Sequence, residues 1–147
     1  MTDRILGEIS MFAGNRAPDG WAFCNGQLLD IASNTPLFSI LGTYYGGDGQ
    51  RTFALPDLRG RVPVGIGQGP GLPSVELGQP GGEATHSLSM PEVPTTDLSV
   101  TTGSGSAVVA HLVGGAPTGT GQPHNIMQPY LGVNYIIVTQ GIWPFTS

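Results

Sequence analysis

The sequence predicts a mixed α+β fold that is rich in strands and has one short helix. Gly (24) and Pro (13) together supply 37 of the 147 residues, so turns must be frequent. Only residues 33–46 space their apolar side chains as a helix does, whereas the other apolar runs are short and bounded by Gly or Pro, as strands are. Charged residues make up only 10% of the chain, which argues against ordinary disorder.

The N-terminal part predicts short strands joined by tight turns. Residues 5–12 alternate loosely, which suits one strand. APDG at residues 17–20 is typical of a turn, because Pro presets φ, Asp can bond its own backbone and Gly tolerates a positive φ. WAFCNGQLL at residues 21–29 predicts a hairpin of two strands around Asn25-Gly26, a dipeptide that two-residue turns favour.

The helix is expected at about residues 35–45. Asn34 or Thr35 can cap its start, and Pro36 suits its first turn. Gly42 or Gly46 can end it. The positions i, i+3, i+4 and i+7 of one face are apolar, namely Leu37, Ile40, Leu41 and Tyr44.

The rest of the chain is expected to be extended or looped, up to a final strand. Pro56 and Pro63 exclude a helix from residues 51–67. Residues 95–121 form either a flexible excursion or edge strands that order against neighbouring chains, and their β-branched residues favour the second. Consecutive apolar residues over Val133 to Thr139 predict a strand buried on both faces.

Three stretches of the chain resemble one known family. They are GEISMFAGNRAPDGWAFCNGQLL, NTPLFSILGTYYGGDGQRTFALPDLRGRVPVGIGQGPG and PHNIMQPYLGVNYIIVTQGIWP, in order from about residue 6 to residue 144. They resemble the phage tail collar family, which includes a module near the end of bacteriophage short tail fibres and standalone bacterial members called microcystin-dependent proteins. The resemblance implies a tail-collar-like domain at residues 1–67. It also implies a Gly/Pro/Thr-rich region at residues 68–147 that packs with the collar and contributes to contacts in a homotrimer.

Asp57, Arg59 and Arg61 lie in the stretch FALPDLRGR, and two roles are open to them. In the family the matching stretch is a structural crossing, so the resemblance implies a structural clamp. The spacing agrees, because Asp57 lies two residues from Arg59 and four from Arg61, where a carboxylate–guanidinium pair can form. The alternative is a surface grip for an anionic ligand. We favour a clamp that is at least partly buried, so that loss of Asp57 or Arg61 destabilises the fold and loss of Arg51 does so less.

The sequence departs from the family at its expected metal site. Similar tail-fibre proteins carry an H-x-H pair after a Met-Pro, where three chains supply six nitrogen ligands to one axial ion. Here Met90-Pro91 is followed by EVPT at residues 92–95. We therefore expect no metal and no cofactor, and an assembly that a chelator leaves unchanged. The three histidines each lack a ligand partner at i+2 or i+4, namely His86, His111 and His124.

The aromatic residues are interpreted as a core set and an exposed pair. Flat rings can stack on sugars, but in a small β domain they more often form the core, and we assign the core to Trp21, Phe23, Tyr130 and Tyr135. Tyr44 and Tyr45 lie at the end of the helix beside GGDG and are expected to be exposed. A receptor or glycan contact is expected at this pair or in residues 95–121.

No catalytic motif is present, so we expect no enzyme. The chain has no G-x-S-x-G and no Walker A lysine, and VGIGQGPG does not fit G-x-G-x-x-G. Cys24 is the only cysteine and is expected to be a buried free thiol. The N-terminus lacks the pattern of a secretory signal, and no apolar run approaches the ~20 residues that span a bilayer. We expect synthesis in the cytoplasm and a place in a virion tail or an extracellular or cell-surface assembly.

Three functions stay open at this stage. The first is an oligomeric structural or adhesion protein of the tail-fibre type, which presents loops to a cell-surface glycan or protein receptor. The second is a subunit of a self-assembling extracellular or particle-associated filament, and the third is a small carbohydrate-active enzyme, which no motif supports. A net charge of −5 argues against nucleic acid or an anionic membrane as the main partner.

Overall fold

The computed structural model of the protein describes residues 4–89 and 122–144. The chain divides into two compact units, one with Met1–Pro80 and Leu131–Ser147, the other with Gly81–Tyr130. We call them the core unit and the ribbon unit. The expected boundary at residue 67 lies inside the core unit and stays a prediction.

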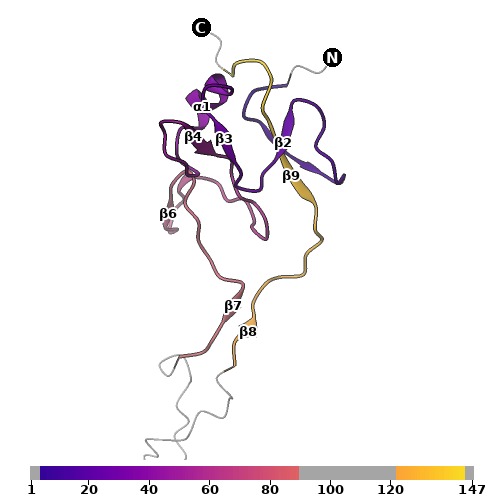
Figure 1. Ribbon diagram of the computed structural model, residues 1–147. Coiled ribbons are helices and arrows are strands. Elements are labelled where there is room, and N and C mark those ends of the chain that lie inside the picture. The colour runs from indigo at the N-terminus through magenta and orange to yellow at the C-terminus, as the bar shows by residue number, and fades with distance from the viewer. Residues whose placement is uncertain (1–3, 90–121, 145–147) are drawn as a thin grey trace, which may run out of the picture. The chain divides into compact units, whose positions relative to one another are not determined.

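A three-stranded antiparallel sheet joins the two ends of the core unit. Its strands are β1 (Ile9–Phe12), β2 (Trp21–Phe23) and β9 (Asn134–Val138), in the order β1-β9-β2. The last strand of the chain therefore lies between the first two, and Figure 1 shows β9 beside β2. Both edges of β9 are hydrogen-bonded by this arrangement.

Burial along β9 follows from its central place. Ile137 pairs with Ile9 of β1 and with Ala22 of β2. Ile136, Ile137 and Val138 are all buried. The predicted strand with both faces covered is therefore confirmed, with its ends one residue inside the expected range.

The only helix in the described residues, α1, spans Thr35–Leu41 and confirms the helix predicted at about residues 35–45. Pro36 lies in its first turn, where a missing N–H costs nothing. Leu37 and Leu41 are buried one turn apart and fix its inner face. The helix ends earlier than expected, because Gly42 takes a positive φ of 51° and donates its N–H to the Phe38 carbonyl.

The predicted hairpin around Asn25-Gly26 is wrong. Its two strands exist, but β3 (Leu28–Asp30) pairs with β4 (Thr52–Ala54), whereas β2 pairs with β9. Gly26 does adopt the positive φ of a turn, 71°, and its N–H bonds to the Pro56 carbonyl at 3.2 Å. The dipeptide therefore carries the chain from one sheet to the next.

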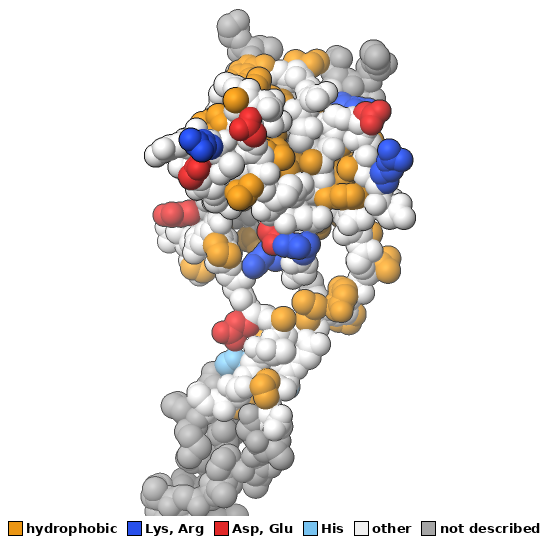
Figure 2. All heavy atoms as spheres, viewed as in Figure 1, with side chains coloured by type: hydrophobic (Ala, Val, Ile, Leu, Met, Phe, Trp, Pro, Cys, Tyr) orange, Lys and Arg blue, Asp and Glu red, His pale blue; other side chains and the backbone are white. Residues whose placement is uncertain are grey.

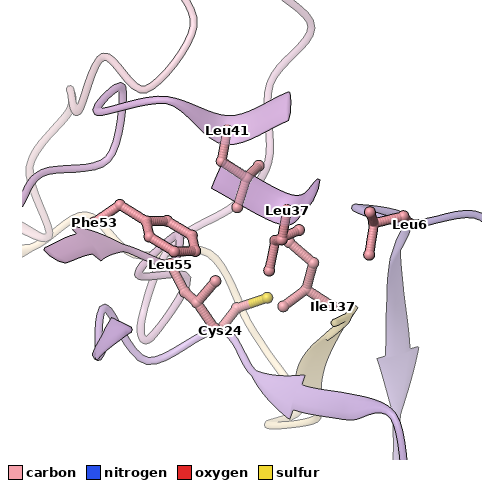
Figure 3. Packing of buried hydrophobic residues seen from close by; sticks show 7 residues of the cluster. All are labelled: Leu6, Cys24, Leu37, Leu41, Phe53, Leu55 and Ile137. Atoms are coloured by element: carbon pink, nitrogen blue, oxygen red, sulfur yellow. The ribbon is translucent and has the colours of Figure 1, made fainter. Parts of the chain in front are cut away.

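Seven residues form the core of this unit. They come from the three-stranded sheet, the β3-β4 sheet, α1 and the adjoining loops. Figure 3 shows Leu37 and Leu41 reaching the cluster from α1, with the Cys24 thiol directed into it. Cys24 is 2% exposed, which confirms the predicted buried free thiol. Burial raises the pKa of this thiol to about 11. The seven residues are Leu6, Cys24, Leu37, Leu41, Phe53, Leu55 and Ile137.

Two short strand pairs complete the described structure. In the core unit, β5 (Gly67–Gln68) pairs with β6 (Ser74–Val75). In the ribbon unit, β7 (Thr85–His86) pairs with β8 (His124–Asn125). One short helix among many short antiparallel strands confirms the predicted fold class.

Residues 95–121, whose structure the sequence leaves open, lie outside the described residues. Across residues 4–89 and 122–144, no helix has both the length and the apolar character needed to cross a membrane.

Candidate functional site

The stretch FALPDLRGR begins as a buried crossing of the core unit. Residues 53–56 are all buried, and the backbone of residues 24–27 holds this crossing in place. The Leu55 N–H bonds to the Gln27 carbonyl at 3.0 Å, and the Leu58 N–H bonds to the Cys24 carbonyl at 3.0 Å. Since these backbone groups are already paired, the crossing has the geometry of a structural element and not of a phosphate cradle.

Asp57 and Arg59 form a two-pronged ion pair just after this crossing. The Arg59 Nε and Nη2 each donate to one Asp57 carboxylate oxygen at 2.8 Å, and the Arg59 backbone N–H donates at 3.2 Å. The side chains are 66% (Arg59) and 39% (Asp57) exposed. The pair is therefore exposed to solvent and not buried, although residues 25 and 26 lie against Asp57.

Arg61 takes a smaller part in this group than expected. Among the hydrogen bonds of the described residues, none joins its side chain to Asp57. The Arg59 hydrogen bond is the main reason that the pKa of Asp57 falls to about 2, and the charge of Arg61 contributes least. The clamp role of all three residues stays a prediction.

Because the pair is exposed, we expect the Asp57→Ala variant to lose only a few degrees of melting temperature. Arg59→Ala is expected to match it, and Arg61→Ala and Arg51→Ala to change less. Thermal melts of the four variants measure this series. If the residues instead grip an anionic ligand, the arginine variants keep wild-type melting temperatures and lose binding to acidic glycans, while Asp57→Ala binds them more tightly. That outcome contradicts the clamp.

Asp48 organises the glycine-rich loop before β4, a role that sequence analysis missed. Its Oδ1 accepts three backbone N–H groups, from Gln50 at 2.9 Å and from Arg51 and Thr52 at 2.8 Å. These bonds, that of Thr52 first, lower the pKa of Asp48 to about 2. The available signal was an Asp between glycines, since Asp often bonds the backbone two residues on.

We expect Asp48 to make the stability of the fold depend on pH. Its folded pKa lies below the usual value, so the ionised form stabilises the fold, and this contribution is complete above about pH 4 and lost as the pH falls toward about 2. Urea unfolding at several pH values should show this loss in the wild type. Asp48→Asn keeps the shape but removes the charge, so it should be less stable at pH 6 and lose less on acidification. An unchanged pH profile in this variant contradicts the assignment.

The two candidate contact tyrosines lie in different environments. Tyr44 is 61% exposed, as predicted. Tyr45 is half-buried against the core cluster, and burial followed by the nearby Cys24 raises the pKa of its hydroxyl. Tyr44 alone thus offers an open ring to a ligand, and its role in a contact stays a prediction.

The aromatic residues assigned to the core are only partly there. Tyr135 packs against the core cluster, and Trp21 and Phe23 are half-buried. Tyr130 is 77% exposed, so its assignment to the core is wrong. It lies in the ribbon unit, whose described residues include no buried cluster.

A shallow depression of about 450 Å³ borders the three-stranded sheet. Arg4 lies over the Trp21 ring, with its guanidinium carbon 5.8 Å from the ring centre. It also donates to the Asp19 carbonyl at 2.7 Å. The guanidinium therefore already covers one face of the Trp21 ring.

The ribbon unit brings together two histidines that are far apart in the sequence. His86 of β7 and His124 of β8 are cross-strand partners, with ring centres 6.0 Å apart in an edge-to-face arrangement. Glu83 Oε2 lies 3.6 Å from His86 Nδ1. Within the described ranges, no three His, Cys, Asp or Glu side chains gather as a metal site would require. His111 lies outside the described residues.

Comparison with known families identifies the part of the chain that contains the crossing and the ion pair. Residues 7–63 match the Phage Tail Collar Domain. We refer to these matched residues as the collar domain. The match confirms the resemblance over β1 to β4, α1 and FALPDLRGR. None of the curated proteins matches the chain.

The collar domain is completed by a strand from outside the matched residues. β9 supplies the middle strand between β1 and β2, and Ile137 of β9 enters the core cluster. Among the candidate residues, those of the ion pair and both tyrosines lie inside the collar domain, whereas His86 and His124 do not. The match to a phage tail collar domain points to a structural role in a phage tail.

Proposed function

We propose that the protein is a non-enzymatic structural subunit of the phage tail-fibre type that assembles with copies of itself and presents loops to a cell-surface receptor. The collar domain at residues 7–63 carries this proposal. The sequence contains no G-x-S-x-G motif, no Walker A lysine and no G-x-G-x-x-G motif in VGIGQGPG. Tyr44, at 61% exposure beside the GGDG loop, is the proposed point of contact with a glycan or protein receptor.

Self-assembly is supported by the surface of the described residues. Many large apolar side chains are exposed. Figure 2 shows many hydrophobic side chains and few charged ones on the face it presents. Exposed apolar side chains in this number are typical of chains that bury part of their surface against a partner. The large apolar residues that are more than 60% exposed are Met11, Tyr44, Val62, Val64, Ile66, Leu72, Tyr130 and Leu131.

The mass of the native particle in solution tests the proposal and its alternative. Light scattering after gel filtration should give a discrete oligomer, and we expect a trimer. Open polymers would favour a filament subunit instead. A stable monomer would contradict both.

We also expect deletion of residues 98–119 to weaken assembly or receptor recognition while the collar domain stays folded. These residues are rich in small and β-branched side chains that neighbouring chains can order. Native mass spectrometry measures assembly, and tryptophan fluorescence reports the fold. A variant with a Gly/Ser segment of equal length separates loss of the sequence from shortening of the chain. If neither variant changes assembly or recognition, the segment is a passive linker.

A further inference from the structure

Residues 62–66 of the core unit form a segment without a partner. Val62, Val64 and Ile66 are 69%, 70% and 64% exposed. Within residues 4–89 and 122–144, no strand pairing and no hydrogen bond involves any residue from 62 to 66. Exposed backbone groups can bond to water, but exposed apolar side chains on an unpaired strand edge indicate a site for a partner chain.

The local fold explains why the core unit does not supply that partner. Residues 62–66 lead directly into β5, which pairs with β6 as far as Gly67 and Val75. The chain after β6 then turns away, with the Gln79 N–H bonded to the Glu76 carbonyl at 3.1 Å. The hairpin therefore ends where the apolar segment begins, and the segment stays beyond it.

Pro63 makes the two edges of this segment unequal. When such a segment pairs as a strand, Val62, Val64 and Ile66 direct their N–H and C=O groups to one edge and their side chains to one face. The opposite edge carries Pro63, which has no N–H to donate. The edge formed by Val62, Val64 and Ile66 can thus form an uninterrupted ladder of hydrogen bonds. These three residues are β-branched and apolar, which favours strand pairing.

We propose that residues 62–66 pair through this edge with a second copy of the chain. The proposal rests on the self-assembly proposed above and names the surface that performs it. An exposed apolar strand edge is a site of strand addition from another chain.

Charge favours a second copy as the partner. Residues 62–75 contain no Asp, Glu, Lys or Arg, and neither do residues 98–147. An uncharged edge offers nothing to a charged partner, because burying an unpaired charge against it is costly. Every copy of this chain carries a long uncharged segment that can meet it without that cost.

A second apolar segment of the core unit lies near the residues that precede the first. Leu58 and Gly60 line a small cavity of about 70 Å³ together with Val133 and Tyr135. Leu131 and Val133, which lead into β9, are 88% and 42% exposed. A stable interface buries about 800 Å² on each partner, more than a five-residue strand provides, so we include residues 131–133 in the contact.

The first experiment places a charge on the proposed edge. In Val64→Glu the new carboxylate points into solvent in a single chain, so the fold is expected to survive, with unchanged tryptophan fluorescence and circular dichroism. In the assembly the same charge is buried without a partner, so association should weaken about 100-fold or more. Native mass spectrometry over a dilution series measures this. Ala32→Glu adds the same charge at an exposed turn and should assemble like the wild type.

The outcomes separate this inference from the proposed function. If the wild type is an oligomer and Val64→Glu assembles equally well, the edge is not the interface although self-assembly stands. If the wild type is a monomer, both fail.

A second experiment identifies the occupant of the edge. A photo-reactive residue at position 64 should give covalent multimers on a denaturing gel after irradiation, and the same residue at position 32 should not. Cross-links at monomer mass that map to residues 90–121 would show that the chain covers its own edge, and they would overturn the proposal.

Discussion

Replacing Phe53 with alanine is expected to destabilise the collar domain by about 3 to 5 kcal/mol. Phe53 is fully buried in the core cluster and packs against Phe38, with ring centres 5.5 Å apart. Loss of the ring removes contacts with both the helix and the neighbouring strands, and β4 cannot collapse into the cavity because Leu55 is also fully buried. The expected loss is a large share of the about 5 to 15 kcal/mol that stabilises a typical domain.

Urea unfolding followed by tryptophan fluorescence measures this effect. Leu28→Ala is the matched control, because Leu28 pairs with Ala54 of β4 but is 60% exposed. It should change the free energy of unfolding by less than about 0.5 kcal/mol. Equal losses in the two variants would contradict the burial that the structure assigns to Phe53.

The Gly47→Ala variant is expected to lose about 2 to 5 kcal/mol of stability. About 1 to 2 kcal/mol comes from the backbone, since Gly47 has a φ of +96° that other residues adopt only with strain. About 1 to 3 kcal/mol comes from overpacking, because an added Cβ would lie 2.6 Å from the Thr52 carbonyl oxygen and against the Phe53 backbone. A loop this close to β4 has no room for a methyl group.

Gly71→Ala isolates the first of these two contributions. Gly71 has a φ of +73°, but no atom lies within 4 Å of an added Cβ. Its loss should therefore stay near about 1 to 2 kcal/mol. Melting curves and urea titrations of the two variants give the difference directly. If Gly71→Ala costs as much as Gly47→Ala, close approach to β4 is not what requires glycine at position 47.

The sequence predicted those elements whose signal is local. The helix followed from apolar spacing and Pro36, and the central strand followed from the apolar run before Thr139. The extended, non-helical backbone of residues 51–67 followed from Pro56 and Pro63. Each of these signals lies within about ten residues of chain, which is the range over which periodicity and turn chemistry act.

Pairing and exposure depended on distant parts of the chain and were predicted less well. Asn25-Gly26 is a good hairpin signal, but β9 arrives from the end of the chain and takes the place beside β2. The ion pair of Asp57 and Arg59 formed as the spacing indicated, yet both side chains stay exposed to solvent. His86 and His124 meet only because two strands pair across a long insertion, which no spacing rule along the sequence reveals.

The buried Cys24 also has a practical consequence. Thiolates, not thiols, react with maleimides and with mild oxidants, and a 2% exposed thiol with a pKa raised to about 11 supplies almost none. Because Cys24 is the only cysteine, a second one introduced at an exposed position such as Leu72 becomes the single reactive thiol. A fluorophore or spin label can then be attached at one chosen point on otherwise native protein.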